Sequence, residues 1–467
     1  RYSLADRKAT QITEKVSEAA VSYDRKVLLY QTGSQWKTMD TKADGSSAKS
    51  LDVNGMLVKV NPQQEWQQIF REGWRYQRDF LYVNNTHGAP WDKIYEWYAP
   101  WVEHVKHRTD LNYIVDIVGG EISVGHSYTR GGDLPDVKRI PIGLLGADFK
   151  QNNGFYQVEK VYTGGNWNPN LEAPLVGPGL DINENDYLIS VNGQAVTSNQ
   201  NIYSYFEGTA GKQVHIEVND KPSSDGARKY VVVPISDEGN LRRYEWIEDN
   251  RKKVEELSGG QLAYVYVPNT GRQGYEYFNR YYFAQQHKKG AVVDERNNGG
   301  GSAADYMADV MARELHGYFN SKVGDHKPFT TPMAGIWGPK VMIINERAGS
   351  GGDLLPYLFR KMEIGTLVGT RTWGGLVGTW DTPRFIDGGR MVAPRGGFYD
   401  INGEWAVEGE GIAPDVEVIQ KPADIIAGKD PQLERAIQIA LDKLDKEALE
   451  LKPEPAPPVK WKRPDQN

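Results

Sequence analysis

The amino-acid sequence predicts a multidomain protein of mixed α/β and β architecture. The chain has 467 residues, of which 39% are hydrophobic, which is more than one hydrophobic core usually serves. Its C-terminal part alternates strand-like and helical segments, and this alternation favours an α/β core. Two further stretches, rich in β-branched and aromatic residues and divided by turn signals, predict additional β modules.

Composition excludes several kinds of site and partner. The chain has no cysteine, so disulfides, thiolate metal ligands and a cysteine nucleophile are ruled out. The formal net charge is -7 and basic residues are dispersed, so we expect no nucleic-acid partner. No run of about 18 apolar residues occurs, so we expect no membrane partner. A first residue other than methionine suggests a piece of a longer chain or a processed one, and we favour the piece.

Residues 1–62 are predicted to form short strands separated by turns. Val27 and Leu29 alternate with Tyr30 and its neighbours in a way that fits half-buried strands. Asp-Arg and Asp-Gly turns between the strands are typical of a β-propeller blade, so this segment is predicted to be the end of a propeller. A plain N-terminal β-extension explains the pattern equally well.

Residues 63–138 are predicted to form a helical domain. Apolar and aromatic side chains recur at helical spacing and are expected to be core: Trp66, Ile69, Phe70, Trp74 and Tyr76. His104 and His107 lie three residues apart, which is a possible metal-ligand spacing. No carboxylate or third histidine accompanies them in a metal-binding motif, so a solvated helix face is the preferred interpretation, and we expect neither a metal nor another cofactor.

Residues 139–238 are predicted to form a compact module of about five strands and one helix. The segments IGLLGADF and DYLISVNGQAV resemble a PDZ domain. The resemblance implies that the loop Gly143, Leu144, Leu145, Gly146 presents backbone N–H groups to the carboxylate of a bound peptide. A tight turn that needs glycine at positive φ is the alternative explanation of the same residues.

Residues 239–450 are predicted to form the α/β core, and the proline-rich residues 451–467 an extended tail. Two glycine clusters follow strands of this core. The first spans residues 294–301, with Gly299 and Gly300 before a helix, and such a corner can receive an anion. The second spans residues 345–353, where Ser350 is flanked by glycines on a strand-to-helix turn.

A serine in such a turn exposes its Oγ, and the N–H of the following residue can stabilise an oxyanion. Each cluster taken alone is more typical of an ordinary flexible loop. The other motifs in the chain change this interpretation. The segments NNGGG, NERAGSGGD, TWGGLVG and VEGEGIAPDVEV occur in this order, and GGEISVGHSY precedes them. Together with the PDZ-like module, they resemble the tricorn branch of the carboxy-terminal-processing serine peptidases over nearly the whole chain.

The resemblance implies roles for individual residues. Ser350 matches the family nucleophile and His126 its general base. The N–H of Gly351, with one from Gly299 or Gly300, matches the oxyanion hole. Glu408 matches the acidic member of the catalytic set. Asp294 and Arg296 are expected to brace the oxyanion loop.

One position departs from the family pattern. In the family, the acid acts through a serine directly before the histidine, and this chain has Gly125 there. We therefore expect Glu408 to reach His126 directly or through water. Replacement of the missing hydroxyl by Ser127 or Ser123, and a weak enzyme, are the alternatives. Glu410 is a competing candidate for the acid.

The resemblance further implies a core of the ClpP/crotonase-like α/β fold and a serine peptidase that hydrolyses unfolded oligopeptides as a homo-oligomer. It suggests a cytoplasmic location, with a periplasmic or secreted one as the alternative. A non-catalytic peptide-binding scaffold that uses the PDZ-like module is the main competing hypothesis, because Gly125 replaces the relay serine. An acyl-CoA enzyme of the crotonase type is disfavoured, because no basic cluster is placed for the CoA phosphates.

Overall fold

The computed structural model describes residues 1–53, 55–165, 167–324, 328–447, 449 and 451–461. The chain divides into two compact units, residues 1–66 and 67–467, with the division inside helix α1 (Pro62–Phe80). Each unit is described by itself. No helix in the described part of the chain is long and apolar enough to span a membrane.

The first unit contains a four-stranded antiparallel sheet in the order β3-β4-β5-β6. Its strands are β3 (Val16–Val21), β4 (Val27–Thr32), β5 (Gln35–Asp40) and β6 (Lys49–Ser50), and a short pair joins β1 (Tyr2–Ser3) to β2 (Lys8–Ala9). Tyr30 and Met39 are the side chains that this sheet buries, whereas Val27 is exposed. The sheet has the size of one propeller blade.

The second unit begins with helices rich in aromatic residues. Beside α1, it contains α2 (Trp91–Tyr98) and α3 (Arg108–Gly120). Ile69 and Phe70 of the predicted stripe are buried in the core, whereas Trp66, Trp74 and Tyr76 are partly exposed. The rings of Trp74 and Trp91 stack 6.3 Å apart. His107 caps α3 by accepting a hydrogen bond from the Thr109 N–H, which is a structural role.

The next module is a six-stranded antiparallel sheet in the order β13-β12-β10-β9-β8, with β11 paired to β10. Its strands are β8 (Ala147–Asn152), β9 (Phe155–Val161), β10 (Tyr187–Val191), β11 (Gln194–Ala195), β12 (Val214–Asn219) and β13 (Arg228–Val232). The predicted helix of this module is a 3-10 helix, Ile202–Phe206, and it packs against the sheet through buried Phe206.

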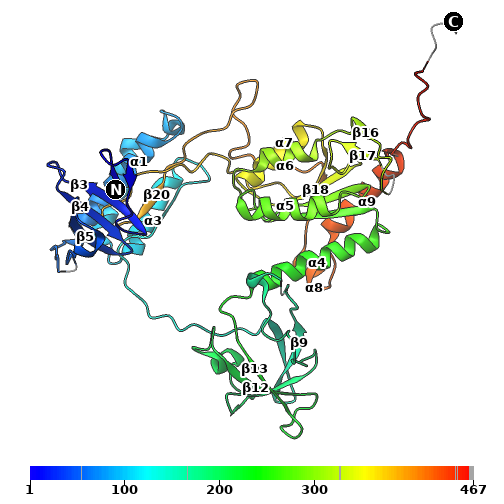
Figure 1. The fold of residues 1–467 in the computed structure, drawn as a ribbon, viewed down its shortest axis with the longest axis horizontal. Coiled ribbons are helices and arrows are strands. Elements are labelled where there is room, and N and C mark those ends of the chain that lie inside the picture. The colour runs from blue at the N-terminus through cyan, green and yellow to red at the C-terminus, as the bar shows by residue number, and fades with distance from the viewer. Residues whose placement is uncertain (54, 166, 325–327, 448, 450, 462–467) are drawn as a thin grey trace. The chain divides into compact units, whose positions relative to one another are not determined.

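The α/β core is built on a parallel sheet in the order β14-β15-β18-β19-β21. The strands are β14 (Leu262–Tyr266), β15 (Gly290–Asp294), β18 (Lys340–Ile344), β19 (Gly365–Gly369) and β21 (Val416–Glu417). Helices flank the sheet (Figure 1): α4 (Gly239–Leu257), α5 (Arg272–Ala284), α6 (Ala304–Met311), α7 (Gly351–Lys361) and α9 (Pro431–Glu447). A short hairpin, β16 (Gly317–Phe319) and β17 (Phe329–Thr331), and helix α8 (Pro422–Ile426) complete it.

Sheet topology brings the two glycine clusters together. Strands β15 and β18 are parallel neighbours, with Asp294 opposite Ile343. Their carboxyl ends therefore lie at the same edge of the sheet, which is where sites form in open α/β sheets. The loops after Asp294 and after Ile344 are consequently adjacent.

A second connection joins the helical segment to the chain that follows β19. Strand β7 (Tyr128–Arg130) pairs with β20 (Arg390–Val392) in an antiparallel register. Arg108 is almost fully buried, and its Nε donates to Asp387 at 2.6 Å. These contacts tie the segment that carries His126 to the segment between residues 370 and 408.

Candidate active site

Ser350 occupies the turn between β18 and α7 in a strained backbone conformation. Its φ is 59° and its ψ is −117°, a region that residues with a side chain rarely adopt. Gly300 lies against it, because a Cβ added to Gly300 would be 2.6 Å from Ser350 Cβ. Gly351 is equally confined, since an added Cβ would lie 2.0 Å from Thr270 Oγ1. The glycines around Ser350 are thus required by close packing as well as by the turn.

The Asp353 carboxylate holds this turn in place through hydrogen bonds to its backbone. Its side chain is fully buried, and its Oδ2 accepts the Ser350 N–H at 2.8 Å and the Gly375 N–H at 3.0 Å. Its Oδ1 accepts the Gly374 N–H at 2.8 Å. Burial raises the pKa of Asp353, and these hydrogen bonds act in the opposite direction. One carboxylate therefore holds the serine turn and the loop at residues 373–375 in a common position.

Trp373, in that loop, contacts both predicted catalytic segments. Its ring meets the His126 ring edge-on at 5.1 Å. A Cβ added to Gly349 would lie 2.6 Å from the indole, and one added to Gly125 would lie 3.1 Å from it. The glycine before Ser350 and the glycine before His126 are thus both packed against one indole.

His126 is buried, with 8% of its surface exposed. Desolvation lowers its pKa, and the charges of Glu408 and Asp353 partly oppose this shift. The imidazole is therefore predominantly neutral at pH 7, as a general base must be. Its Nδ1 is buried and has no hydrogen-bond partner within the described residues. The Ser350 Oγ and the imidazole form no hydrogen bond with each other in the described part of the chain.

Glu408 is oriented by backbone groups. Its Oε1 accepts the Gly125 N–H at 2.8 Å, and its Oε2 accepts the N–H groups of Leu376 at 2.6 Å and Val377 at 2.8 Å. The structure thus brings Glu408 to the residue directly before His126. The sequence predicted a direct or a water-mediated contact between Glu408 and His126, and the direct hydrogen bond is absent from the described contacts.

The other candidates for orienting the histidine are placed differently. Ser127 Oγ accepts a hydrogen bond from Gln77 Nε2 at 2.6 Å, which engages it away from the imidazole. Glu410 is exposed, and its backbone carbonyl accepts a hydrogen bond from Arg371. Ser123 is exposed, with φ of 57°. Glu408 is therefore the acid whose contacts reach the histidine segment.

Backbone donors near Ser350 differ in availability. The Gly299 N–H donates to Pro268 O at 3.1 Å, and the Gly300 N–H donates to Asn298 Oδ1 at 2.9 Å. Among the described contacts, the Gly351 N–H has no acceptor. Gly351 is therefore the predicted oxyanion donor that is unengaged, whereas the donors expected from Gly299 and Gly300 are occupied in this conformation.

Asn298 couples the two glycine clusters, a function that the sequence patterns did not single out. Besides binding the Gly300 N–H, it accepts the Gly349 N–H through its backbone carbonyl at 3.0 Å. Its Nδ2 donates to Glu295 Oε2 at 3.0 Å. Burial raises the pKa of Glu295 well above its ordinary value, and the hydrogen bond from Asn298 opposes this shift.

Asp294 and Arg296 brace the first loop, as expected. Arg296 donates to both carboxylate oxygens of Asp294, at 2.9 and 2.6 Å, and to Asp430 Oδ1 at 2.9 Å. All three groups are buried. The network anchors the loop to the start of α9 and contributes no free group to the site.

In the predicted peptide-carboxylate loop of the 139–238 module, three of the four backbone N–H groups donate to internal partners. The Gly143 N–H donates to Phe206 O, and the Leu144 N–H donates to Ile235 O. The Gly146 N–H donates to the carboxylate of Glu238 at 3.1 Å, and φ of Gly146 is +67°. Leu145 points its side chain into the core. The tight-turn explanation thus accounts for Gly146.

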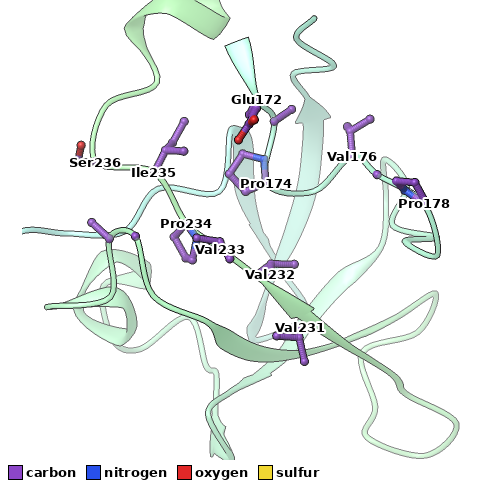
Figure 2. Close-up of a pocket in the computed structure, with 14 residues that line it drawn as sticks. Glu172, Pro174, Val176, Pro178, Val231, Val232, Val233, Pro234, Ile235 and Ser236 are labelled. Atoms are coloured by element: carbon purple, nitrogen blue, oxygen red, sulfur yellow. The ribbon is translucent and has the colours of Figure 1, made fainter. Parts of the chain in front are cut away.

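Beside this loop is an apolar pocket of about 700 Å³. Figure 2 shows Val231, Val232 and Val233 along the end of β13, with Pro174 and Val176 on the facing segment. Val231 and Val233 are about half exposed. The module therefore offers apolar contacts next to a loop in which, among the described contacts, the Leu145 N–H alone has no acceptor.

Comparison with known proteins agrees with this architecture. Three family models match successive parts of the chain: the tricorn protease C1 domain at residues 62–119, the tricorn protease PDZ domain at 143–237 and peptidase family S41 at 261–418. The order of the three matches is the order of the helical segment, the β module and the α/β core.

Similar proteins extend the match over almost the whole chain. Tricorn protease homolog 1 of Streptomyces coelicolor is 34% identical over 98% of this chain, and the tricorn protease of Thermoplasma volcanium is 31% identical over 97%. Each alignment covers 43% of the relative. A crystal structure of the tricorn protease superposes on 95% of this chain and 43% of its own, with a TM-score of 0.89 and 29% identity.

The chain therefore spans less than half the length of these relatives. Their similarity covers both glycine clusters, the histidine segment and the PDZ module at once. The chain belongs to the tricorn protease family, and its α/β core matches the model of peptidase family S41.

Proposed function

We propose that this chain is the catalytic part of a peptidase that hydrolyses unfolded oligopeptides through an acyl-enzyme on Ser350. The observation that carries the proposal is the packing of the Ser350 and His126 segments on the indole of Trp373, with Glu408 bonded to the residue before His126. Ser350 lies at a strained strand-to-helix turn with φ of 59°, the kind of turn that carries a nucleophilic serine in other hydrolases.

In the proposed reaction, Ser350 Oγ forms a bond to the peptide carbonyl carbon while His126 Nε2 takes the hydroxyl proton. The tetrahedral intermediate collapses when the carbon–nitrogen bond breaks and His126 returns the proton to the leaving amine. Water then attacks the acyl-enzyme with the same histidine as base, which releases the acid and restores the Ser350 hydroxyl.

Negative charge that develops on the carbonyl oxygen needs hydrogen-bond donors. The free N–H of Gly351 is the first, and removal of one such donor typically costs 10²- to 10³-fold in kcat. Gly299 and Gly300 supply a second donor only if one of their N–H groups leaves its present acceptor. We infer that substrate binding releases the Gly300 N–H from Asn298, because Gly300 lies against Ser350.

Glu408 has a positioning role in this proposal. It holds the backbone at Gly125 and so aims the adjacent imidazole. Its charge also favours the imidazolium that forms during attack. With glycine at position 125, no side-chain hydroxyl from that residue reaches Nδ1, and a water molecule is the group we expect to bridge Nδ1 and Glu408.

The PDZ module is proposed to hold extended peptides through its apolar pocket. Assembly into a homo-oligomer and a cytoplasmic location are also part of the proposal. Family membership supports them, and light scattering and cell fractionation test them. The non-catalytic scaffold is not favoured, since the S41 peptidase match spans both glycine clusters.

A fluorophosphonate probe tests the nucleophile. It should label the protein on Ser350, as peptide mapping by mass spectrometry would show, because only an activated serine reacts with such a probe. Ser350→Ala should abolish the label, and Ser127→Ala is the matched control that should keep it. Absence of labelling in the parent, or labelling that survives Ser350→Ala, would contradict the proposed function.

A further inference from the structure

A basic pocket of about 360 Å³ lies between strand β7 and the segment that leads into β20. Its charged lining comprises Arg130, Arg384, Arg390 and Asp381, with Tyr128 and Trp380 as the aromatic members. All three arginines are exposed. The pocket therefore presents three guanidinium groups against one carboxylate.

These three guanidinium groups lack carboxylate partners within the described part of the chain, although neighbouring arginines have other contacts. Arg108 is paired with Asp387, and Arg395 donates to the backbone carbonyl of Asp381. Arg130 contacts only an aromatic face, with its guanidinium 5.7 Å from the centre of the Tyr128 ring. The pocket thus keeps an excess of positive charge, because Asp381 is the one carboxylate among its described lining residues.

The strand register adds an independent observation. Arg390 is the direct cross-strand partner of Arg130 in the antiparallel β7–β20 pair. Like charges directly opposite each other destabilise a sheet. An anion between the two side chains would remove this repulsion and gain charge-assisted hydrogen bonds, for which the planar guanidinium group is well suited.

The pocket also adjoins the proposed active site. Strand β7 begins two residues after His126, and the Tyr128 ring lies 6.4 Å from the His126 ring. Tyr128 lines the pocket as well, so one residue borders both. An extended peptide held at Ser350 would therefore pass the pocket within a few residues of the bond that is cleaved.

We propose that this pocket binds a carboxylate of the peptide substrate close to the cleaved bond. The inference rests on the proposed peptidase function, which it deepens by naming an acidic group as a specificity determinant. An Asp or Glu side chain and the peptide's terminal carboxylate share the required chemistry. The experiment distinguishes these two sources.

The test uses peptides that share one cleavable sequence. The reference peptide carries a C-terminal amide and a Gln. The second peptide replaces that Gln by Glu, and the third keeps the Gln but has a free C-terminal carboxylate. The Gln or Glu is placed in turn at each position on either side of the cleaved bond. The measurements are kcat/KM on the parent chain and Kd on Ser350→Ala. At least one carboxylate peptide should exceed the reference by about 10- to 100-fold, as expected for a charge-assisted pair.

Arg130→Gln and, on the loop, Arg384→Gln should reduce this ratio to within about threefold. Arg272→Gln, an exposed arginine paired with Glu276 on α5, is the matched control and should keep the ratio. A preference for the Glu peptide identifies a side chain as the ligand, and a preference for the free acid identifies the terminus. Equal kcat/KM and Kd for all three peptides, or a ratio that survives both variants, would overturn the inference.

Labelling of Ser350 by the fluorophosphonate probe is measured in parallel. If the parent is not labelled, the proposed function fails, and the Kd ratios on Ser350→Ala still decide the pocket. If the parent is labelled and the ratios are flat, the function stands and the pocket assignment fails.

Discussion

Two glycine-containing loops in this chain look alike in sequence and differ in what their backbone donors do. At the Ser350 turn, the Gly351 N–H has no acceptor among the described contacts, while buried Asp353 holds the neighbouring Ser350 N–H. At Gly143–Gly146, three of the four N–H groups donate to internal acceptors, including the Glu238 carboxylate, and that of Leu145 alone has none among the described contacts. A glycine loop can bind an anion only where the fold leaves a donor unsatisfied.

Ser350→Ala tests this comparison and should have the largest effect on activity. Loss of the nucleophile should reduce kcat by about a millionfold, because residual catalysis comes only from binding and oxyanion stabilisation. His126→Ala should be nearly as inactive, since nucleophile and base act as a unit. The midpoint of denaturant unfolding should stay unchanged for Ser350→Ala, because glycines carry the tight packing of the turn. Retention of more than about a tenth of the activity would contradict the assignment.

Glu408→Gln should cause the next largest loss, about 10²- to 10⁴-fold in kcat. The upper value is the loss that followed amide replacement of the triad aspartate in a serine protease. A glutamine has one acceptor oxygen and an NH₂ group, and here three backbone N–H groups need acceptors. Exposed Glu410→Gln should stay within about twofold. A large loss for Glu410→Gln together with full activity for Glu408→Gln would show that Glu410 is the acid of the catalytic set.

The pH dependence of kcat/KM tests the electrostatics of the same site. Desolvation lowers the pKa of His126 from its ordinary 6.5, so the acid limb should have a midpoint below this value. Activity should therefore fall as pH decreases through that midpoint, because the protonated imidazole cannot accept the serine proton. Glu408→Gln removes a charge that raises the pKa of His126. The acid limb of this variant should therefore have its midpoint at lower pH than that of the parent. A flat profile from pH 5 to 8 would contradict a histidine base.

Glu238→Ala tests the other loop of the comparison, Gly143–Gly146. The variant removes the acceptor of the Gly146 N–H and an ion pair to Arg242, so unfolding free energy should fall by about 1–3 kcal/mol. Hydrolysis of a small activated ester should be unchanged, because the loop contributes no group to acyl transfer. Peptide C-terminal carboxylates should gain no affinity, since the Gly143 and Leu144 N–H groups keep their partners. Tighter carboxylate binding, measured by calorimetry, would show that Glu238 blocks a functional loop.

Much of the architecture was predictable because it depends on local patterns. Alternating strands and helices predicted the α/β core, and the mixed α/β architecture with a PDZ domain is confirmed. Which backbone N–H groups already have internal hydrogen-bond acceptors was not predictable. That Asn298 occupies the Gly300 N–H, or Glu238 the Gly146 N–H, depends on pairings set by tertiary structure.

The roles of Trp373 and Asp353 illustrate the same limit. Both occur in motifs that the sequence made visible, TWGGLVG and NERAGSGGD. Nothing in the local pattern shows that one indole packs against Gly125 and Gly349, more than two hundred residues apart. The glycines were informative after all, since a residue without Cβ before each predicted catalytic residue signals close approach by a bulky neighbour.

Gly125→Ser should have the smallest effect, and it separates two opposing contributions. A hydroxyl at this position could accept a hydrogen bond from Nδ1 of His126, which is buried without a partner, and so favour the tautomer in which Nε2 is the base. The new Cβ would lie 3.1 Å from the Trp373 ring and from Gly375 Cα, so the indole must shift by a few tenths of an ångström. A water that already bridges Nδ1 and Glu408, as we propose, would limit the gain from the hydroxyl, so we expect kcat/KM to change by no more than several-fold.

Gly125→Ala is the matched control, because it introduces the same Cβ without the hydroxyl and should lower kcat/KM slightly. The ratio of the serine to the alanine variant then measures the hydroxyl alone, free of the crowding that both share. Since Glu408 bonds the Gly125 N–H and not the imidazole, insertion of a hydroxyl should interrupt no existing contact. If the serine variant were no better than the alanine variant, Nδ1 would already be satisfied in solution, as a water bridge to Glu408 would achieve.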